Sequence, residues 1–149
     1  MKHCYLKAMA VVLMGVLALN VAQAQDEPPF IPGDYWEVTG VKTADGAGLK
    51  YARWLAGEWR KNNEFAKSQG WIKDFMVINN VHARSDEPDL YLVRVFEGMP
   101  TVEEGEERRA KYMAWAKKSM DTMAEESGNR AEFRTVMSTS LLRHMQFRD

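Results

Sequence analysis

Cysteine and histidine are scarce in this 149-residue sequence, which contains one cysteine, Cys4, and three histidines. Cys4 lies in an N-terminal segment that we expect to be removed on export, so the mature chain has no disulfide, no thiolate nucleophile and no cysteine ligand for a metal. Motifs of common catalytic sites are also missing: there is no glycine-rich phosphate loop, no serine nucleophile elbow and no carboxylate pair at a motif spacing. These absences favour binding over catalysis.

Basic tracts are absent as well. Removal of residues 1–24 takes away Lys2 and Lys7, which leaves 18 of the 20 basic residues and all 21 acidic residues. A mildly acidic chain with no cluster of lysine and arginine argues against nucleic acid as a partner.

Residues 1–24 show the three parts of a secretory signal peptide. Lys2 and Lys7 precede an apolar run over 8–21, and Ala22-Gln23-Ala24 supplies small residues where a signal peptidase cleaves. The run is short for a membrane span, and an uncleaved anchor is the alternative. We therefore expect a periplasmic or secreted protein that has no membrane attachment after cleavage.

The mature chain is long enough for one domain with a hydrophobic core. Residues 25–33 predict an extended leader, because their three prolines prevent a helix and disfavour a central strand. The remaining residues, 34–149, form the predicted domain.

The pattern of apolar, β-branched and turn residues predicts the order β-α-β-β-α-β. The predicted elements are a strand over 35–42, a helix over 47–69, strands over 71–82 and 89–96, a helix over 101–126, a short helix over 130–137 and a strand over 138–147. Gly70 is placed to cap the first helix, and Thr101 with Glu104 predicts a capping box at the start of the second. The apolar stripe predicted for the first helix consists of Leu49, Ala52, Leu55, Trp59 and Ala66.

Right-handed crossovers place the third strand beside the first in such an order. The predicted fold class is therefore α+β, a ferredoxin-like sandwich with a four-stranded antiparallel sheet and two helices on one face. The other face has no helix to cover it, and a sheet containing the strand over 89–96 would expose a large apolar surface there. We therefore expect a homodimer that forms through the sheet.

Arg94 interrupts the apolar strand DLYLVRVF, where an unpaired guanidinium would be costly to bury. Glu37 lies on the neighbouring first strand, and the two charges meet if their side chains share a face. His144 is a third candidate from the last strand. Such a cluster on the uncovered face is either an ion pair that sets strand register or the floor of a cavity in which Arg94 binds an anion or carbonyl.

The element order, the compact size and the implied sheet-on-sheet dimer resemble the dimeric α+β barrel superfamily over residues 35–147. The segments YWEVTGVK, LKYARWLAGEWRKNNEFAKSQGW and EPDLYLVRVFEGMPT are similar to small exported proteins of Gram-negative bacteria that have no assigned activity. The resemblance implies many activities, which include cofactor-free monooxygenases, isomerases, stress proteins and haem-degrading enzymes. The last of these use a histidine of the second helix, and residues 101–126 contain none.

Few polar residues of the mature chain are candidates for chemistry. His82 and His144 are candidate bases, although a loop histidine and a hydrogen-bonded sheet histidine are the structural alternatives. The candidate ligand-binding residues are Arg94, Glu37, Tyr35, Trp36 and Asn80. No histidine or carboxylate spacing indicates a metal site, and no cofactor is expected.

Two classes of function follow from these residues. The first is an exported, small-molecule-binding or stress-related protein that holds a mainly apolar ligand among its tryptophans and methionines. The alternative is a cofactor-independent monooxygenase or isomerase for an aromatic or polyketide-like substrate. That enzyme would use His144 or His82 as base and Arg94 to stabilise an enolate-like anion.

Overall fold

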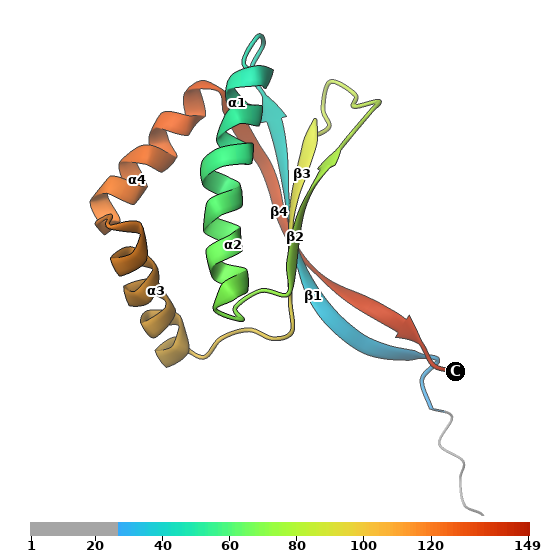
Figure 1. Ribbon diagram of the computed structural model, residues 1–149. Coiled ribbons are helices and arrows are strands. Elements are labelled where there is room, and N and C mark those ends of the chain that lie inside the picture. The colour runs from blue at the N-terminus through green and yellow to red at the C-terminus, as the bar shows by residue number, and fades with distance from the viewer. Residues whose placement is uncertain (1–26) are drawn as a thin grey trace, which may run out of the picture.

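The computed structural model describes residues 27–149, and the predicted signal peptide lies outside this range. Four antiparallel strands form a single sheet in the order β2-β3-β1-β4. The strands are β1 (Phe30–Thr43), β2 (Asp74–Asn79), β3 (Leu90–Phe96) and β4 (Arg134–Phe147). The predicted α+β class and the four-stranded antiparallel sheet are confirmed (Figure 1).

The first helical segment runs without a break from Gly48 to Ser68, close to its predicted bounds. It comprises α1 (Gly48–Trp54), the π-helical turn η1 (Leu55–Trp59) and α2 (Arg60–Ser68). Gly70 has a φ of 70° just after it, as a glycine cap requires. The predicted apolar stripe was partly wrong, because Leu49 and Ala52 are exposed and Tyr51 is buried instead.

The second helical region differs from the prediction. It is broken into α3 (Val102–Ala116) and α4 (Met120–Asn129), followed by the single turn η2 (Arg130–Glu132). The break occurs because Lys117 adopts a left-handed conformation and the Ser119 side chain then caps α4. The capping box of Thr101 and Glu104 is confirmed at the start of α3. The short helix predicted over 130–137 is present only as the turn η2, and the prediction was wrong over 134–137, where β4 begins.

Strand β1 begins earlier than predicted, within the proline-rich leader. Phe30 to Pro32 pair only with the end of β4, and the register shifts between Pro32 and Tyr35. Pro32 is tolerated there because this part of β1 has β4 on one side and no strand on the other, so the proline lies at a sheet edge. The two strands form a ribbon that projects beyond the sheet (Figure 1).

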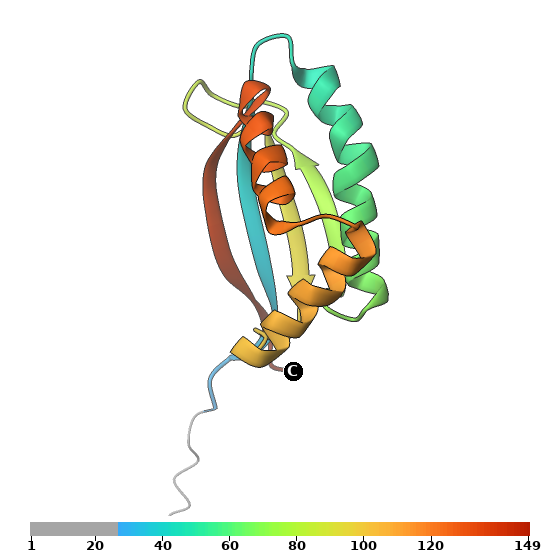
Figure 2. The same ribbon diagram turned by 90° about the vertical axis from the view of Figure 1, so that its left-hand side faces the viewer.

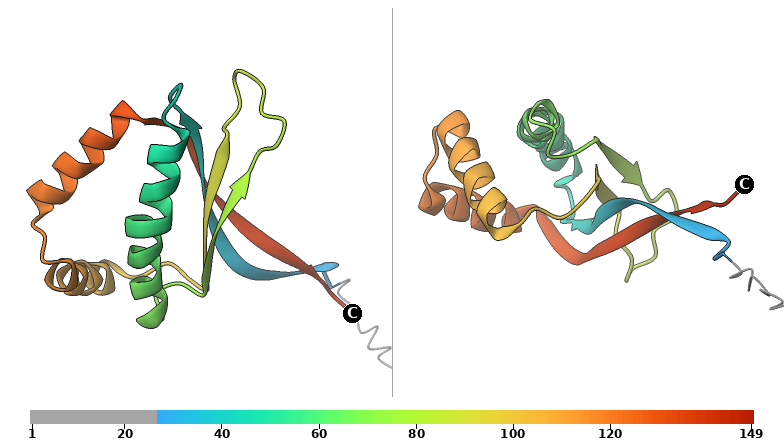
Figure 3. Two further views of the ribbon diagram at one scale, coloured as in Figure 1. Left: turned by 45° about the horizontal axis from the view of Figure 1, so that its top comes forward. Right: turned by 90° about the horizontal axis from the view of Figure 1, so that it is seen from below.

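The helices all lie on one side of the sheet (Figures 1 and 2). The helix of residues 48–68 covers that face, and the residues buried with it are Val41, Tyr51, Leu55, Trp59 and Phe133. Helices α3 and α4 stand farther out (Figure 3), and neither contains a fully buried residue. No helix within residues 27–149 has the length and apolarity needed to cross a bilayer.

Candidate functional site

Arg94 links the centre of the sheet to the covering helix. Its Nη1 donates to Glu37 Oε1 at 3.1 Å, and its Nε donates to Asn63 Oδ1 at 2.9 Å. The predicted meeting of Glu37 and Arg94 across β1 and β3 is therefore confirmed, since the two residues are paired in register. Both side chains face the helices, so the expected position of this cluster on the uncovered face was wrong.

The π-helical turn explains why Asn63 reaches Arg94. Tyr51, Leu55, Trp59 and Asn63 recur every four residues, and all four are buried. In an ideal α-helix each four-residue step drifts by about 40°, because 3.6 residues complete a turn. The wider turn at 55–59 absorbs this drift and holds the four side chains on one face.

Both ends of the buried Asn63 amide are hydrogen-bonded. Its Nδ2 donates to the Trp59 carbonyl at 2.8 Å, while Oδ1 accepts from Arg94. Arg94 uses two of its five N–H donors in these contacts, and 43% of its side chain is exposed. The guanidinium is therefore fixed in position yet retains donors for a ligand.

A cavity of about 400 Å³ lies beside this network. Its size falls within the range typical of small-molecule sites. The lining residues are Glu37, Asn62, Asn63, Ala66, Trp71, Ile72, Arg94, Phe96, Gly98, Met99, Pro100, Arg108 and Tyr112. Helix α2, the sheet, the segment after β3 and α3 each form part of the wall.

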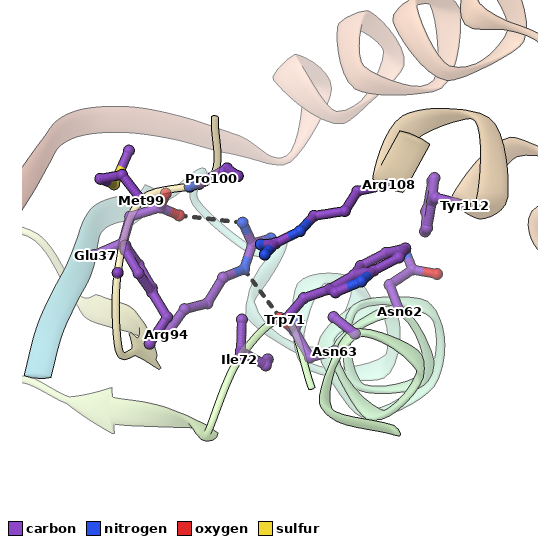
Figure 4. Close-up of a pocket in the computed structure, with 13 residues that line it drawn as sticks. Glu37, Asn62, Asn63, Trp71, Ile72, Arg94, Met99, Pro100, Arg108 and Tyr112 are labelled. Atoms are coloured by element: carbon purple, nitrogen blue, oxygen red, sulfur yellow. Dashed lines mark hydrogen bonds and ion pairs between the residues drawn. The ribbon is translucent and has the colours of Figure 1, made fainter. Parts of the chain in front are cut away.

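Arg108 projects from α3 into the cavity toward Arg94 (Figure 4). Within residues 27–149 it forms no ion pair. The lining contains two arginines, Arg94 and Arg108, and one acidic residue, Glu37. Burial raises the pKa of Tyr112, which keeps its hydroxyl protonated near neutral pH. The cavity thus presents hydrogen-bond donors on an aromatic and aliphatic wall.

Aromatic contacts hold α3 against α2 at the cavity rim. The Phe65 ring stacks on the Trp115 ring with centroids 4.2 Å apart, and Tyr112 lies 6.2 Å from Phe65. Stacking of this kind is worth roughly 0.5–1.5 kcal/mol beyond the buried area. The outer wall of the cavity therefore depends on a few side-chain contacts and not on a packed core.

Lys118 makes the second connection between the outer helices and the long helix. Its Nζ lies 2.6 Å from Glu58 Oε1 and 2.7 Å from Glu126 Oε2. The hydrogen bond from Lys118 lowers the pKa of Glu58, and the bonds to Glu126 and then Glu58 raise the pKa of Lys118. Glu58 and Lys118 are consequently both charged near neutral pH.

The predicted site residues are only partly brought together. Tyr35 shares the face of Glu37 and stacks on Phe96 at 6.0 Å. Trp36 points to the opposite face, where its ring lies 6.2 Å from His144. His144 therefore does not join Arg94, because neighbouring residues of a strand point to opposite sides of the sheet.

The other two candidates lie in the β2–β3 connection, away from the cavity. His82 is exposed in that loop. Asn80 uses its side chain to donate to the Pro88 carbonyl at 3.0 Å, which closes the hairpin. The structure gives Asn80 a local structural contact and does not place it in the lining.

The sequence prediction missed the lining residues Asn63, Arg108 and Tyr112, whereas Trp71 and Met99 belong to the tryptophans and methionines that were expected to hold a ligand. A polar asparagine within an apolar helical stripe is a signal for Asn63, but the π-helical turn hides its phase. Arg108 and Tyr112 lie on a helix with ordinary surface composition, and only the position of α3 turns them toward Arg94.

No group of three or more histidine, cysteine or acidic side chains within residues 27–149 is arranged to hold a metal ion. Comparisons of the chain with protein-family models, curated proteins and solved structures find no match. The geometry of the site is therefore the basis for a functional assignment.

Proposed function

We propose that the protein binds a small, mainly apolar molecule in the 400 Å³ cavity beside Arg94. The observation that carries this proposal is the combination of an aromatic and aliphatic wall with a guanidinium held at one position by Glu37 and Asn63. An apolar body would fill the space between Trp71 and Tyr112, and a polar group would accept from the donors of Arg94 that remain free.

The alternative of a cofactor-independent monooxygenase or isomerase requires a base near Arg94. Neither His82 nor His144 lines the cavity, and the protonated Tyr112 is not a base. Glu37 is the only carboxylate in the lining, and it already accepts from Arg94. Binding without catalysis is therefore the better-supported proposal.

We further propose the ferredoxin-like class, which is compatible with the observed sheet, and a homodimer formed through the uncovered face. Register places Trp36, Tyr91, Ile78 and Leu142 on that face, and the last two are large apolar side chains with 43% and 52% exposure. Light scattering tests the dimer: a monomer at micromolar concentration would contradict it. Leu142→Glu should dissociate the dimer, whereas Leu141→Glu, on the opposite face, should not.

Export to the periplasm stays a proposal that rests on residues 1–24. Cleavage after Ala24 would leave Gln25 as the first residue of the exported protein. Intact-mass measurement of the protein from a periplasmic fraction tests this, and a full-length mass in that fraction would contradict cleavage.

The binding proposal is tested with N-phenyl-1-naphthylamine, a neutral aromatic probe whose fluorescence rises in apolar sites. Ala66→Phe places a ring in the cavity and should weaken probe binding at least tenfold. Ala56→Phe, on the same helix but in a separate groove beside β2, is the matched control and should bind like the wild type. Equal binding by all three proteins, or no binding by the wild type, would overturn the proposal.

A second measurement uses the protein's own ligand. Native mass spectrometry of the exported protein should detect a co-purified small molecule in the wild type and less of it in the Ala66→Phe variant. The same molecule at equal occupancy in both proteins would place the ligand elsewhere.

A further inference from the structure

A second cavity, of about 180 Å³, adjoins the larger one at the Glu37–Arg94 pair. Both cavities are lined by these two residues. Along the same face of β3, Phe96 lines the larger cavity and Leu92 lines the smaller one. The ion pair therefore lies between the two spaces.

The smaller cavity contains two buried donors that have no partner. The Tyr51 hydroxyl and Arg130 Nε are both inaccessible to solvent and make no hydrogen bond within residues 27–149. Tyr51 is completely buried. Leaving a buried polar group unpaired is unfavourable, so both groups are expected to have a partner that the polypeptide does not supply.

The charge of this cavity is strongly positive. Arg94, Arg130 and Arg134 line it, and Glu37 is its one acidic residue. Glu37 is paired with Arg94, while neither Arg130 nor Arg134 forms an ion pair within the described part of the chain. Two guanidinium charges are therefore left without a counter-charge in contact.

The local packing holds these donors in place. The Arg130 guanidinium lies 4.8 Å from the centre of the Trp54 ring, and Trp54 stacks on Tyr51 with centroids 5.6 Å apart. Burial raises the pKa of Tyr51 and lowers that of Arg134. The Tyr51 hydroxyl thus remains a donor, and the Arg134 charge is held in a site that a negative group would stabilise.

We propose that this cavity is a binding subsite for a compact oxyanion, a carboxylate, sulfonate or phosphate group, held by Arg130, Arg134 and the Tyr51 hydroxyl. The arginines can only donate and the protonated Tyr51 hydroxyl can donate as well, so one acceptor would satisfy all three groups. Water could satisfy the hydrogen bonds but would not neutralise the two charges. The volume is below that of a typical small-molecule site and suits a single head group.

This inference extends the proposed function. The anion subsite is independent of that function, but a single ligand that spans both cavities rests on it. A ligand that fills both spaces is an organic acid with an apolar body beside Trp71 and Tyr112 and its anionic group beneath Tyr51. The same subsite would also accept a free inorganic oxyanion, and the experiment distinguishes the two sources.

Two fluorescent probes that differ by one group provide the test. The probe 8-anilinonaphthalene-1-sulfonate has the same rings as N-phenyl-1-naphthylamine and adds a sulfonate. The wild type should bind the sulfonate probe at least tenfold more tightly than the neutral one. Arg134→Met and Arg130→Met should each abolish most of this preference and leave affinity for the neutral probe within twofold.

Tyr51→Phe and Arg53→Met complete the set of variants. Tyr51→Phe should weaken binding of the sulfonate probe severalfold while the protein remains at least as thermally stable as the wild type, since the lost hydroxyl has no partner. Arg53→Met removes an exposed arginine from the same helix and should change neither affinity. Thermal melts of each variant establish that it is folded.

The outcomes separate this inference from the proposed function. Equal affinity for both probes in the wild type and the arginine variants would overturn the subsite and leave apolar binding intact. If neither probe binds, the proposed function fails, and sulfate then tests the subsite alone. A rise in melting temperature with sulfate that is lost in Arg134→Met supports a free-anion site, and no rise overturns it.

Discussion

Arg94 Nε donates a 2.9 Å hydrogen bond to Oδ1 of Asn63, which joins the third strand to the buried face of the long helix. The same guanidinium pairs with Glu37 on the first strand at 3.1 Å. Three elements of the fold thus meet at one side chain, and a binding cavity adjoins it. The arginine in an apolar strand is satisfied by its neighbours and still partly open.

Asn63→Ala should lower the free energy of unfolding by about 1–3 kcal/mol, because it removes a buried amide and leaves one donor of Arg94 unpaired. Urea unfolding measures the change. Asn62→Ala is the matched control, since Asn62 is half-buried on the same helix and its side chain forms no hydrogen bond within residues 27–149. Equal effects of the two substitutions would mean that the Arg94 contact contributes little.

Glu37→Gln should strengthen binding of the sulfonate probe by about two- to tenfold, because it removes the one negative charge shared by both cavities. Affinity for the neutral probe should stay within twofold. Fluorescence titration at low salt gives both values, and the gain should shrink as salt rises. Glu97→Gln, at a strongly exposed position outside the lining, serves as control, and an equal gain in that variant would point to a general charge effect.

Lys118→Met should loosen the outer helices, because Lys118 connects Glu58 of the long helix with Glu126 of α4. Hydrogen exchange of the amides in residues 102–129 should become faster, with little change in the sheet. Lys111→Met, an exposed position on α3, is the control. Unchanged exchange in Lys118→Met would show that the aromatic contacts of Phe65 are sufficient.

The same contact predicts a stability profile with pH. The pKa of Glu58 is lowered in the folded protein from its ordinary value of 4.5, so its contribution is present above that value and is lost as pH falls through the folded pKa. The pKa of Lys118 is raised above 10.5, so its contribution is present below that value and is lost at more alkaline pH. The melting temperature should therefore decrease as the pH is lowered below about 4.5. In Lys118→Met this decrease should be smaller. An equal decrease in the variant and the wild type would exclude Glu58 as its source.

Lys117→Gly should stabilise the protein by about 0.5–1 kcal/mol, because Lys117 ends α3 with a φ of 53°, where glycine is free of the Cβ penalty. Lys111→Gly, in the interior of the same helix, should destabilise by about 1 kcal/mol. Urea unfolding of both variants gives the comparison. A loss of stability in Lys117→Gly would contradict this prediction.

Local sequence signals predicted several features correctly. Thr101 and Glu104 form their capping box, Gly70 follows the first helix with positive φ, and Glu37 meets Arg94 across adjacent strands. Each of these depends on a few neighbouring residues or on strand order. Prediction was wrong where one helix became two and where residues 134–137 joined β4, because Lys117 has no sequence preference for the conformation that breaks the helix.

The sequence by itself determined the α+β class, the antiparallel sheet and the neighbouring positions of Glu37 and Arg94, since hydrophobic period and crossover handedness are properties of the chain. Only the tertiary structure decided which face these charges occupy. It also decided that His144 lies on the other face and that Asn63, Arg108, Arg130 and Tyr51 surround the cavities. These positions depend on how the π-helical turn rotates the side chains around the long helix and on the direction in which α3 runs. No local sequence pattern encodes either one.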